Sequence, residues 1–205
     1  MKRAALITSS IAIVASVAAL ALAGGGFSAF QASPPAVWSP LSTATVAISL
    51  SSTGSTGSLS VGAQNLVPGD TVQREVKLSN TGTAPIGAVT LAATVSPSNL
   101  LSTDTTDGLQ VEAQTCSTAW TATSLADGGY TYACSGPVTS VIAREPIGSL
   151  ASSTPLTAVG SIPVSGSANL VITVSLPSTA GNTYQGMTTT IDYTFVATQA
   201  AGGNA

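Results

Sequence analysis

Residues 66–96 read LVPGDTVQREVKLSNTGTAPIGAVTLAATVS and contain two segments in which hydrophobic and polar side chains alternate. The first segment places Val72, Arg74, Val76 and Leu78 on one face and Gln73, Glu75 and Lys77 on the other. The second repeats the pattern with Val89, Leu91, Ala93 and Val95. A period of two is typical of strands with one buried face. Because only a short Asn80-Thr81-Gly82 turn follows the first segment, the pattern predicts an antiparallel pair.

A turn with a clear chemical basis precedes the first segment. Pro68 fixes its own φ, Gly69 permits a positive φ, and the side chain of Asp70 accepts backbone hydrogen bonds. These residues predict a tight turn that leads directly into the strand.

The rest of the chain contains further short segments that are typical of strands. Val46, Ile48 and Leu50 alternate with the small residues Thr45, Ala47 and Ser49, and a Ser/Thr/Gly run at 51–60 predicts a loop. Further strands are predicted at 109–116, 130–134, 138–143, 156–159, 168–176 and 188–198. After residue 30 no segment combines helical periodicity with helix caps. The sequence therefore predicts an all-β fold, an antiparallel jelly-roll-like or Ig-like sandwich over 43–199, with a flexible tail at 200–205.

The composition excludes several classes of function. Only 6% of the 205 residues are charged, the net charge is −3, and His is absent. Without a basic surface, binding to nucleic acid is not expected. Without His, the common hydrolase triads and zinc motifs cannot form, so we expect no enzyme, no cofactor and no metal site. A neutral Ser/Thr surface also does little to oppose self-association.

The N-terminus has the pattern of a secretory signal peptide. Lys2 and Arg3 precede about twenty uncharged residues at 4–23 and a run of three glycines at 24–26. We predict a signal peptide at 1–29, with cleavage between Ala29 and Phe30, and a secreted mature chain. The alternative is an anchor that stays in the membrane, because about twenty apolar residues can span a bilayer.

Cys116 and Cys134 are the only cysteines, and in an exported chain they predict a disulfide. Trp120, an Asp-Gly-Gly turn at 127–129 and the alternating stretch 130–132 lie between them, which indicates a hairpin tied at its base. Closing such a loop stabilises the fold by about 3 kcal/mol in the chain-entropy model. A redox or metal-binding pair is the competing interpretation.

Residues 30–42 are predicted to form an extended N-terminal arm. The stretch FQASPPAVWSPL contains three prolines, and Phe30, Val37, Trp38 and Leu41 are its large apolar side chains. An extended arm of this kind can add to the edge of a sheet and place its apolar side chains in pockets.

Three segments carry a resemblance to a known family. GGGFSAF at 24–30 looks like the region cleaved by the SipW-type signal peptidase of Gram-positive bacteria. PGDTVQREVKLSNTG at 68–82 and NTYQGMTTTIDYTFVATQ at 182–199 are similar to the turn-strand-turn and terminal motifs of the same family. The chain thus resembles the TasA/camelysin family of exported, fibre-forming biofilm-matrix proteins. The matching motif residues are Pro68, Gly69, Asp70, Asn80, Gly82, Asn182, Tyr184, Gln185, Gly186 and Gln199.

The resemblance implies a secreted subunit of extracellular or cell-surface fibres. Its partners would be further copies of itself, a SipW-type signal peptidase, and other matrix or cell-wall components. It would contact a membrane only through an uncleaved signal peptide. In related filaments the freed arm completes a sheet of the neighbouring subunit. Because prolines limit the ladder bonds of residues 30–41, the donor segment can instead lie at 43–50.

Two other functions compete with this one. A monomeric secreted Ig-like module could bind a cell-wall polymer or a protein partner, and the aromatic residues Trp120, Tyr130 and Tyr132 could serve such a contact instead of packing around the disulfide. The camelysin branch is associated with metallopeptidase activity, against which the absence of His argues.

Three smaller features are further candidates for a site. The Asp-Thr-Thr-Asp-Gly stretch at 104–108 suggests either a weak Ca²⁺ site or, as we favour, a solvated turn. Arg144 and Glu145 form at most a local ion pair, to which no function is assigned. The Asn182–Gly186 motif is expected to form a structured turn, with the tyrosine ring in the core and the amides bonded to backbone.

Overall fold

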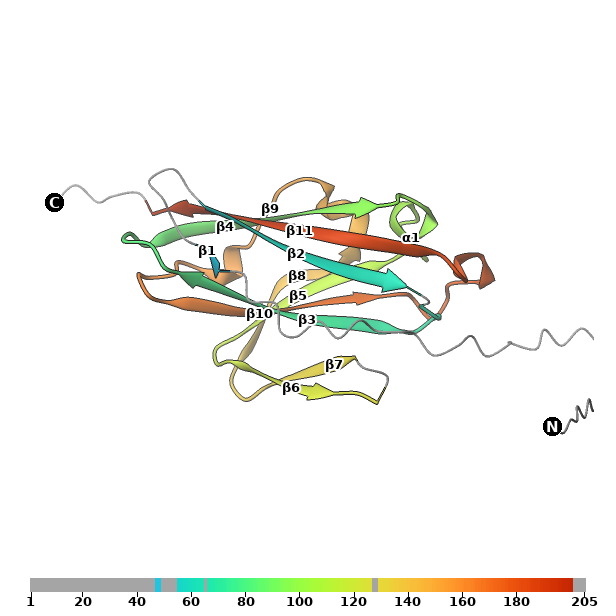
Figure 1. Ribbon diagram of the computed structural model, residues 1–205, viewed down its shortest axis with the longest axis horizontal. Helices are drawn as coiled ribbons and strands as arrows, with labels where there is room; N and C mark the ends of the chain where they lie inside the picture. Colours follow the sequence, from blue (N-terminus) through green and yellow to red (C-terminus); the bar gives the residue numbers. More distant parts are fainter. Residues whose placement is uncertain (1–46, 49–54, 65, 127–128, 201–205) are drawn as a thin grey trace, which may run out of the picture. The chain divides into compact units, whose positions relative to one another are not determined.

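The computed structural model describes residues 47–48, 55–64, 66–126 and 129–200, which form two packed sheets and a separate hairpin (Figure 1). The five-stranded sheet has the order β1 (Ala47–Ile48), β3 (Thr71–Asn80), β10 (Ser167–Ser175), β5 (Gln110–Cys116) and β8 (Val138–Pro146). The four-stranded sheet has the order β2 (Ser55–Gln64), β11 (Thr188–Gln199), β4 (Ile86–Ser96) and β9 (Thr154–Pro155). Apart from the parallel pair of β1 and β3, neighbouring strands are antiparallel. The predicted antiparallel β-sandwich is confirmed.

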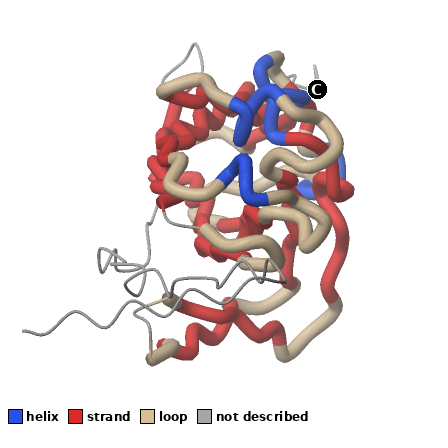
Figure 2. The backbone as a smooth tube through the Cα atoms, turned by 90° about the vertical axis from the view of Figure 1, so that its right-hand side faces the viewer, coloured by secondary structure: helices blue, strands red, loops and turns tan. Residues whose placement is uncertain are grey.

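Within the described residues, helical structure is limited to short turns, drawn in blue in Figure 2. They are α1 (Leu100–Thr103) and three 3₁₀ turns, η1 (Ile147–Ala151), η2 (Thr157–Val159) and η3 (Asn182–Tyr184). The amide of Asn99 caps α1 by accepting from the backbone N–H of Leu101 at 2.9 Å. Such a brief helix has too few residues to show a helical period, so the sequence did not predict it.

The core lies between the two sheets and consists of the inward faces of the alternating strands. On β11 the predicted face is confirmed, because Ile191, Tyr193, Phe195 and Ala197 are all buried. The Tyr193 hydroxyl has no hydrogen-bond partner among the described residues, and burial raises the pKa of this phenol. The two inner faces thus meet in one core of Val, Ile, Leu and Ala side chains with a few buried aromatic rings.

The predicted antiparallel pair within residues 66–96 is wrong. β3 pairs with β10 and β1, whereas β4 pairs with β11 and β9, so the two strands lie in opposite sheets. The turn that was expected to close a hairpin instead carries the chain from one sheet to the other. The buried Asn80 holds this crossing, because its amide donates to the carbonyls of Ala84 and Ile162 and accepts from the N–H of Gly82. The two hydrophobic faces therefore meet across the core.

Two other expectations need correction. Residues 55–60, predicted as loop, belong to β2, which pairs along β11 despite its Ser and Gly content. Long-range pairing overrides local propensity there. Residues 157–159, predicted as strand, form η2. Most other predicted strands are confirmed with ends shifted by one to three residues, and β7 (Tyr130–Cys134) coincides with the prediction.

Candidate assembly surface

The two long sides of the sandwich differ in how their edge strands are protected. On one side, β9 has only two residues and ends at Pro155, and the pairing of β8 with β5 shifts register twice. On the other side lie β2 and β3, both ten residues long, with β1 in contact with each. Short, proline-containing or bulged edges resist strand addition, whereas long regular edges invite it. The β2–β3 side is therefore the candidate surface for assembly.

β3 presents every second residue to its outer edge. The N–H of Asn80 donates to Gly166 and the carbonyl of Asp70 accepts from Leu176, so these two even-numbered residues point toward the β10 side. The β3–β10 register is unbroken between them. Because backbone groups alternate in direction along an antiparallel strand, the odd-numbered residues point away from β10. These residues are Thr71, Gln73, Glu75, Lys77 and Ser79.

Among the described residues, β1 covers only one end of this edge. Ala47 pairs with Ser79, and Ile48 pairs with Asn80, in parallel. Closer to the middle of β3, side chains occupy the edge. Nη1 of Arg74 donates to the carbonyl of Gln73 at 2.8 Å, and the Tyr132 phenol lies near the backbone of Glu75.

The hairpin of β6 (Trp120–Ser124) and β7 brings Tyr132 to this position. It lies on the outer side of the five-stranded sheet, beside β3 and β10 (Figure 1). The N–H of Tyr132 donates to Oε1 of Gln73 at 3.2 Å, and Nε1 of Trp120 donates to the carbonyl of Asn169 at 3.1 Å. Outer-face residues that would otherwise be exposed, such as Val171, are consequently buried.

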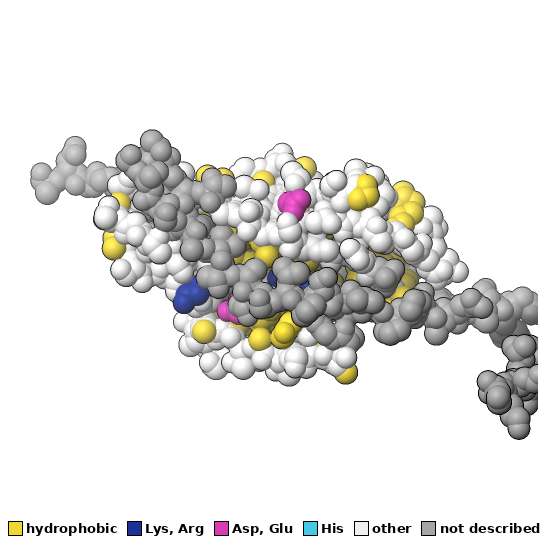
Figure 3. All heavy atoms as spheres, in the orientation of Figure 1, with side chains coloured by type: hydrophobic (Ala, Val, Ile, Leu, Met, Phe, Trp, Pro, Cys, Tyr) yellow, Lys and Arg dark blue, Asp and Glu magenta, His cyan; other side chains and the backbone are white. Residues whose placement is uncertain are grey.

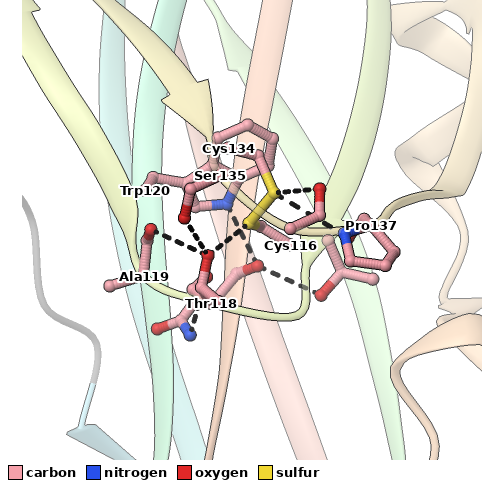
Figure 4. Close-up of a disulfide and its surroundings, with 10 residues drawn as sticks. Cys116, Thr118, Ala119, Trp120, Cys134, Ser135 and Pro137 are labelled. Atoms are coloured by element: carbon pink, nitrogen blue, oxygen red, sulfur yellow. Dashed lines mark hydrogen bonds between the residues drawn. A yellow bond between two sulfur atoms is a disulfide. The ribbon is translucent and has the colours of Figure 1, made fainter.

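The predicted disulfide joins Cys116 and Cys134 at the base of this hairpin, with a Cα–Cα distance of 5.9 Å (Figure 4). Trp120 pairs directly with Cys134 across the hairpin, and Thr118 forms a hydrogen bond with Ser135 at 3.0 Å. The bridge links the end of β5 to the end of β7, so it fixes the hairpin to the sandwich.

The side chains beneath the hairpin are partly shielded from water. Glu75, predicted to face solvent, is only 9% exposed. Burial raises the pKa of its carboxyl, and the nearby Lys77 opposes this shift. Burial also raises the pKa of the Tyr132 phenol. The rings of Tyr130 and Tyr132 lie 6.5 Å apart with a 36° tilt, so the predicted aromatic residues are neighbours on β7.

The turn at Pro68–Asp70 forms as predicted. Gly69 has a φ of 97°, and the carboxylate of Asp70 accepts from the N–H of Val67 at 3.0 Å. This turn precedes β3, and the crossing at Asn80 follows it. The two turns of the 68–82 motif therefore mark the two ends of the candidate edge.

The terminal motif is joined to the Asp104 turn, a contact that the sequence did not reveal. The Tyr184 ring is buried as predicted, and its hydroxyl donates to Oδ2 of Asp104 at 2.6 Å. This hydrogen bond, with backbone donors from residues 106–108, lowers the pKa of Asp104 to about 2 and raises that of Tyr184 to about 12. The stretch at 104–108 forms the expected turn, and the bond from Tyr184 ties this turn to the terminal motif.

The other residues of this motif form a turn, but not with the predicted bonds. Nε2 of Gln185 donates to the side-chain oxygen of Asn182 at 3.3 Å rather than to backbone, and Gly186 has a φ of 70°. Gln199 ends β11 at a shift in its pairing with β4. Arg144 donates from Nη2 to the hydroxyl of Ser175 at 2.7 Å, which ties β8 to β10 across β5.

Several predicted features lie outside the described residues. They are the signal peptide, the Ala29–Phe30 bond, the arm at 30–42 with Phe30, Val37, Trp38 and Leu41, and the tail beyond residue 200. Within the ranges that the structure covers, no helix has the length and apolar character of a membrane span. The same ranges contain no group of three or more His, Cys, Asp or Glu side chains placed to hold a metal ion.

The chain carries few charged side chains, which make up 6% of its residues. On the face in Figure 3 most visible side chains are uncharged, with isolated acidic and basic groups. A hollow of about 250 Å³ lies near the disulfide, where β5, β8 and β10 approach η2. Its lining side chains include no ionisable group apart from the bridged Cys116, so it offers nothing for acid–base chemistry. The lining residues are Thr115, Cys116, Ser117, Pro137, Thr139, Ala158, Val159, Ser167, Ala168 and Asn169.

Comparison with known proteins gives one match. Residues 7–133, more than half of the chain, match the family described as camelysin metallo-endopeptidase. A search of curated proteins finds no match. The matched segment includes β1 to β6 and most of β7, and thus the candidate edge, but it ends one residue before Cys134.

Proposed function

Because the chain belongs to the camelysin family, which includes the fibre-forming TasA proteins it resembles, we propose that it is a secreted structural subunit. In this proposal it assembles with copies of itself into extracellular or cell-surface fibres of a biofilm matrix, by donation of an N-terminal strand. The observation that carries the proposal is the long edge of β3, to which a segment close to the N-terminal arm already adds as β1.

The pairing of β1 defines the register that a donated strand would use. Ala47 lies opposite Ser79, so continuing the same register backwards places Val46 opposite Leu78, Ala44 opposite Val76 and Ser42 opposite Arg74. The even-numbered residues of this segment would then face the core with small or apolar side chains. Pro40, which lacks an N–H, would end the ladder. The donor segment in this proposal is therefore 41–48, close to the alternative at 43–50.

Exchange of the donor segment between two subunits would leave the number of contacts nearly unchanged. The same segment can pair with its own β3 or with the β3 of a second copy, and the bonds formed are identical in the two cases. Assembly then depends on concentration and on release of the N-terminus. Cleavage between Ala29 and Phe30 by a SipW-type peptidase would free the arm for this exchange.

We propose a structural rather than a catalytic role, although the family is described as a metallo-endopeptidase. With no His in the chain, a zinc site would need three dispersed carboxylates or the bridged cysteines. The alternative function is a monomeric binding module for a cell-wall polymer or protein, for which the Tyr130–Tyr132 pair is the only aromatic cluster among the described residues.

The test is electron microscopy with sedimentation of the mature protein, beginning at Phe30, and of two proline variants. Val46→Pro removes an N–H that the register directs at the β3 edge, whereas Thr45→Pro removes one directed away from it. We expect fibres from the wild type and from Thr45→Pro, and none from Val46→Pro. Monomers in all three samples would favour the binding module, and fibres from all three would contradict strand donation in this register.

A further inference from the structure

The side chains of Arg74 and Tyr132 lie at a position on the β3 edge where an added strand would pair. The carbonyl of Gln73 and the N–H of Glu75 both point away from β10, so both face the position of an added strand. The guanidinium of Arg74 donates to the first at 2.8 Å. Tyr132 lies beside the second, because its N–H donates to Oε1 of Gln73 at 3.2 Å and its phenol is close to the Glu75 backbone.

A parallel strand needs these same two groups. In a parallel ladder, a residue opposite position j donates its N–H to the carbonyl of j−1 and accepts from the N–H of j+1. The residue opposite Arg74 would therefore bond to Gln73 and Glu75. In the register of β1 that residue is Ser42. Arg74 supplies the donor of the missing residue, and Tyr132 lies beside the Glu75 backbone that the residue's carbonyl would reach.

We propose that Arg74 and Tyr132 form a removable plug on the acceptor edge, which a strand at 41–48 of a second copy must displace before subunits join. The inference rests on the proposed function and adds to it a control point for assembly. The plug prevents unrelated strands from pairing with the edge, because a strand that lacks a favourable register gains too little to displace both side chains.

The two halves of the plug are held differently. Arg74 belongs to β3 itself, and its long side chain reaches the neighbouring carbonyl without help. Tyr132 is carried by the hairpin, whose position depends on the bond from its N–H to Gln73, on the bond from Trp120 to Asn169, and on the disulfide. The hairpin thus acts as the support that keeps the phenol at the edge.

The charge distribution agrees with this role. Beyond residue 29 the chain has only three basic residues, Arg74, Lys77 and Arg144, and two of them stand on β3. Arg74 lies on the strand face that otherwise supplies the buried Val72, Val76 and Leu78. A charged residue at an inward-facing position of an edge strand is a known means of opposing unwanted pairing.

The test uses matched single substitutions in the mature protein. Tyr132→Phe keeps the ring but removes the hydroxyl near the Glu75 backbone, and Tyr130→Phe makes the same change at the neighbouring ring. Arg74→Gln removes the guanidinium, and Arg144→Gln does so on the opposite side of the sheet. The readouts are the lag time of fibre formation, followed by light scattering, and hydrogen exchange of the Glu75 amide in freshly prepared monomer.

We expect Tyr132→Phe and Arg74→Gln to shorten the lag about fivefold, the effect of losing one hydrogen bond, while both controls keep the wild-type lag. In Tyr132→Phe the Glu75 amide should also exchange faster than in Tyr130→Phe. Fibres from the wild type with unchanged lag and exchange in all variants would overturn the plug but leave strand donation intact. Absence of fibres from every protein would overturn both, whereas fibres from the plug variants alone would support both.

Discussion

The two long sides of the sandwich use different means to keep their edges unpaired. The β8–β9 side is closed by the backbone itself, through a two-residue strand ending at Pro155 and two register shifts along β8. The β3 edge on the other side is regular in backbone and is occupied by the side chains of Arg74 and Tyr132. Backbone irregularity is permanent, whereas a side chain can rotate away. Among the described residues the long regular edge lies on the β3 side, which supports the proposal that this side accepts a strand.

Of the substitutions that test this difference between the two sides, Lys77→Pro should have the largest effect on fibre formation. The N–H of Lys77 faces the outer edge, so proline at this position removes a donor from the acceptor ladder without breaking a bond to β10. We expect a folded protein that no longer forms fibres, as measured by circular dichroism and sedimentation. Lys77→Ala, which loses the charge but keeps the N–H, should assemble like the wild type. Fibres from Lys77→Pro would show that β3 is not the acceptor.

Much of the fold could be predicted from alternation, because a half-buried strand imposes its period on the sequence. The inward face of β11 and the extent of β7 are examples. Pairing could not be predicted in the same way. The Asn80 turn looks like a hairpin turn from its residues, and only its bonds to Ala84 and Ile162 show that it links two sheets. Which strands become neighbours depends on long-range contacts that a local pattern does not encode.

The candidate site was less predictable than the fold. The disulfide and the Gly69 turn followed from residue type, since a secreted cysteine pair and a Pro-Gly-Asp stretch each have one dominant use. The proposed plug could not be predicted from residue type. Tyr132 and Arg74 are 58 residues apart in the sequence and come close only after the hairpin folds onto the sheet. The one hint in the sequence was Arg74, a charged residue on the otherwise hydrophobic face of its strand.

The disulfide variant should have the next largest effect. Replacing both Cys116 and Cys134 by Ser removes the link that holds the hairpin to the sandwich, and should lower the free energy of unfolding by about 3 kcal/mol. Urea denaturation measures this loss. If the hairpin supports Tyr132, the same variant should form fibres after a shorter lag. Wild type treated with a reductant serves as the control and should match the variant, and an unchanged urea midpoint would contradict a stabilising bridge.

Tyr184→Phe should have the smallest effect on assembly, because its contact with Asp104 joins a terminal turn to a loop and contributes no group to the β3 edge. We expect a wild-type lag with reduced stability. The lowered pKa of Asp104 contributes stability that is fully present above about pH 4 and is lost as pH falls toward 2, since the unfolded carboxyl binds a proton first. Removing the hydroxyl should raise that pKa and flatten the decline, as urea denaturation at several pH values would show. Tyr193→Phe, whose hydroxyl has no partner in the described core, should lose no stability, and an altered lag in Tyr184→Phe would mean that assembly depends on more than the β3 side.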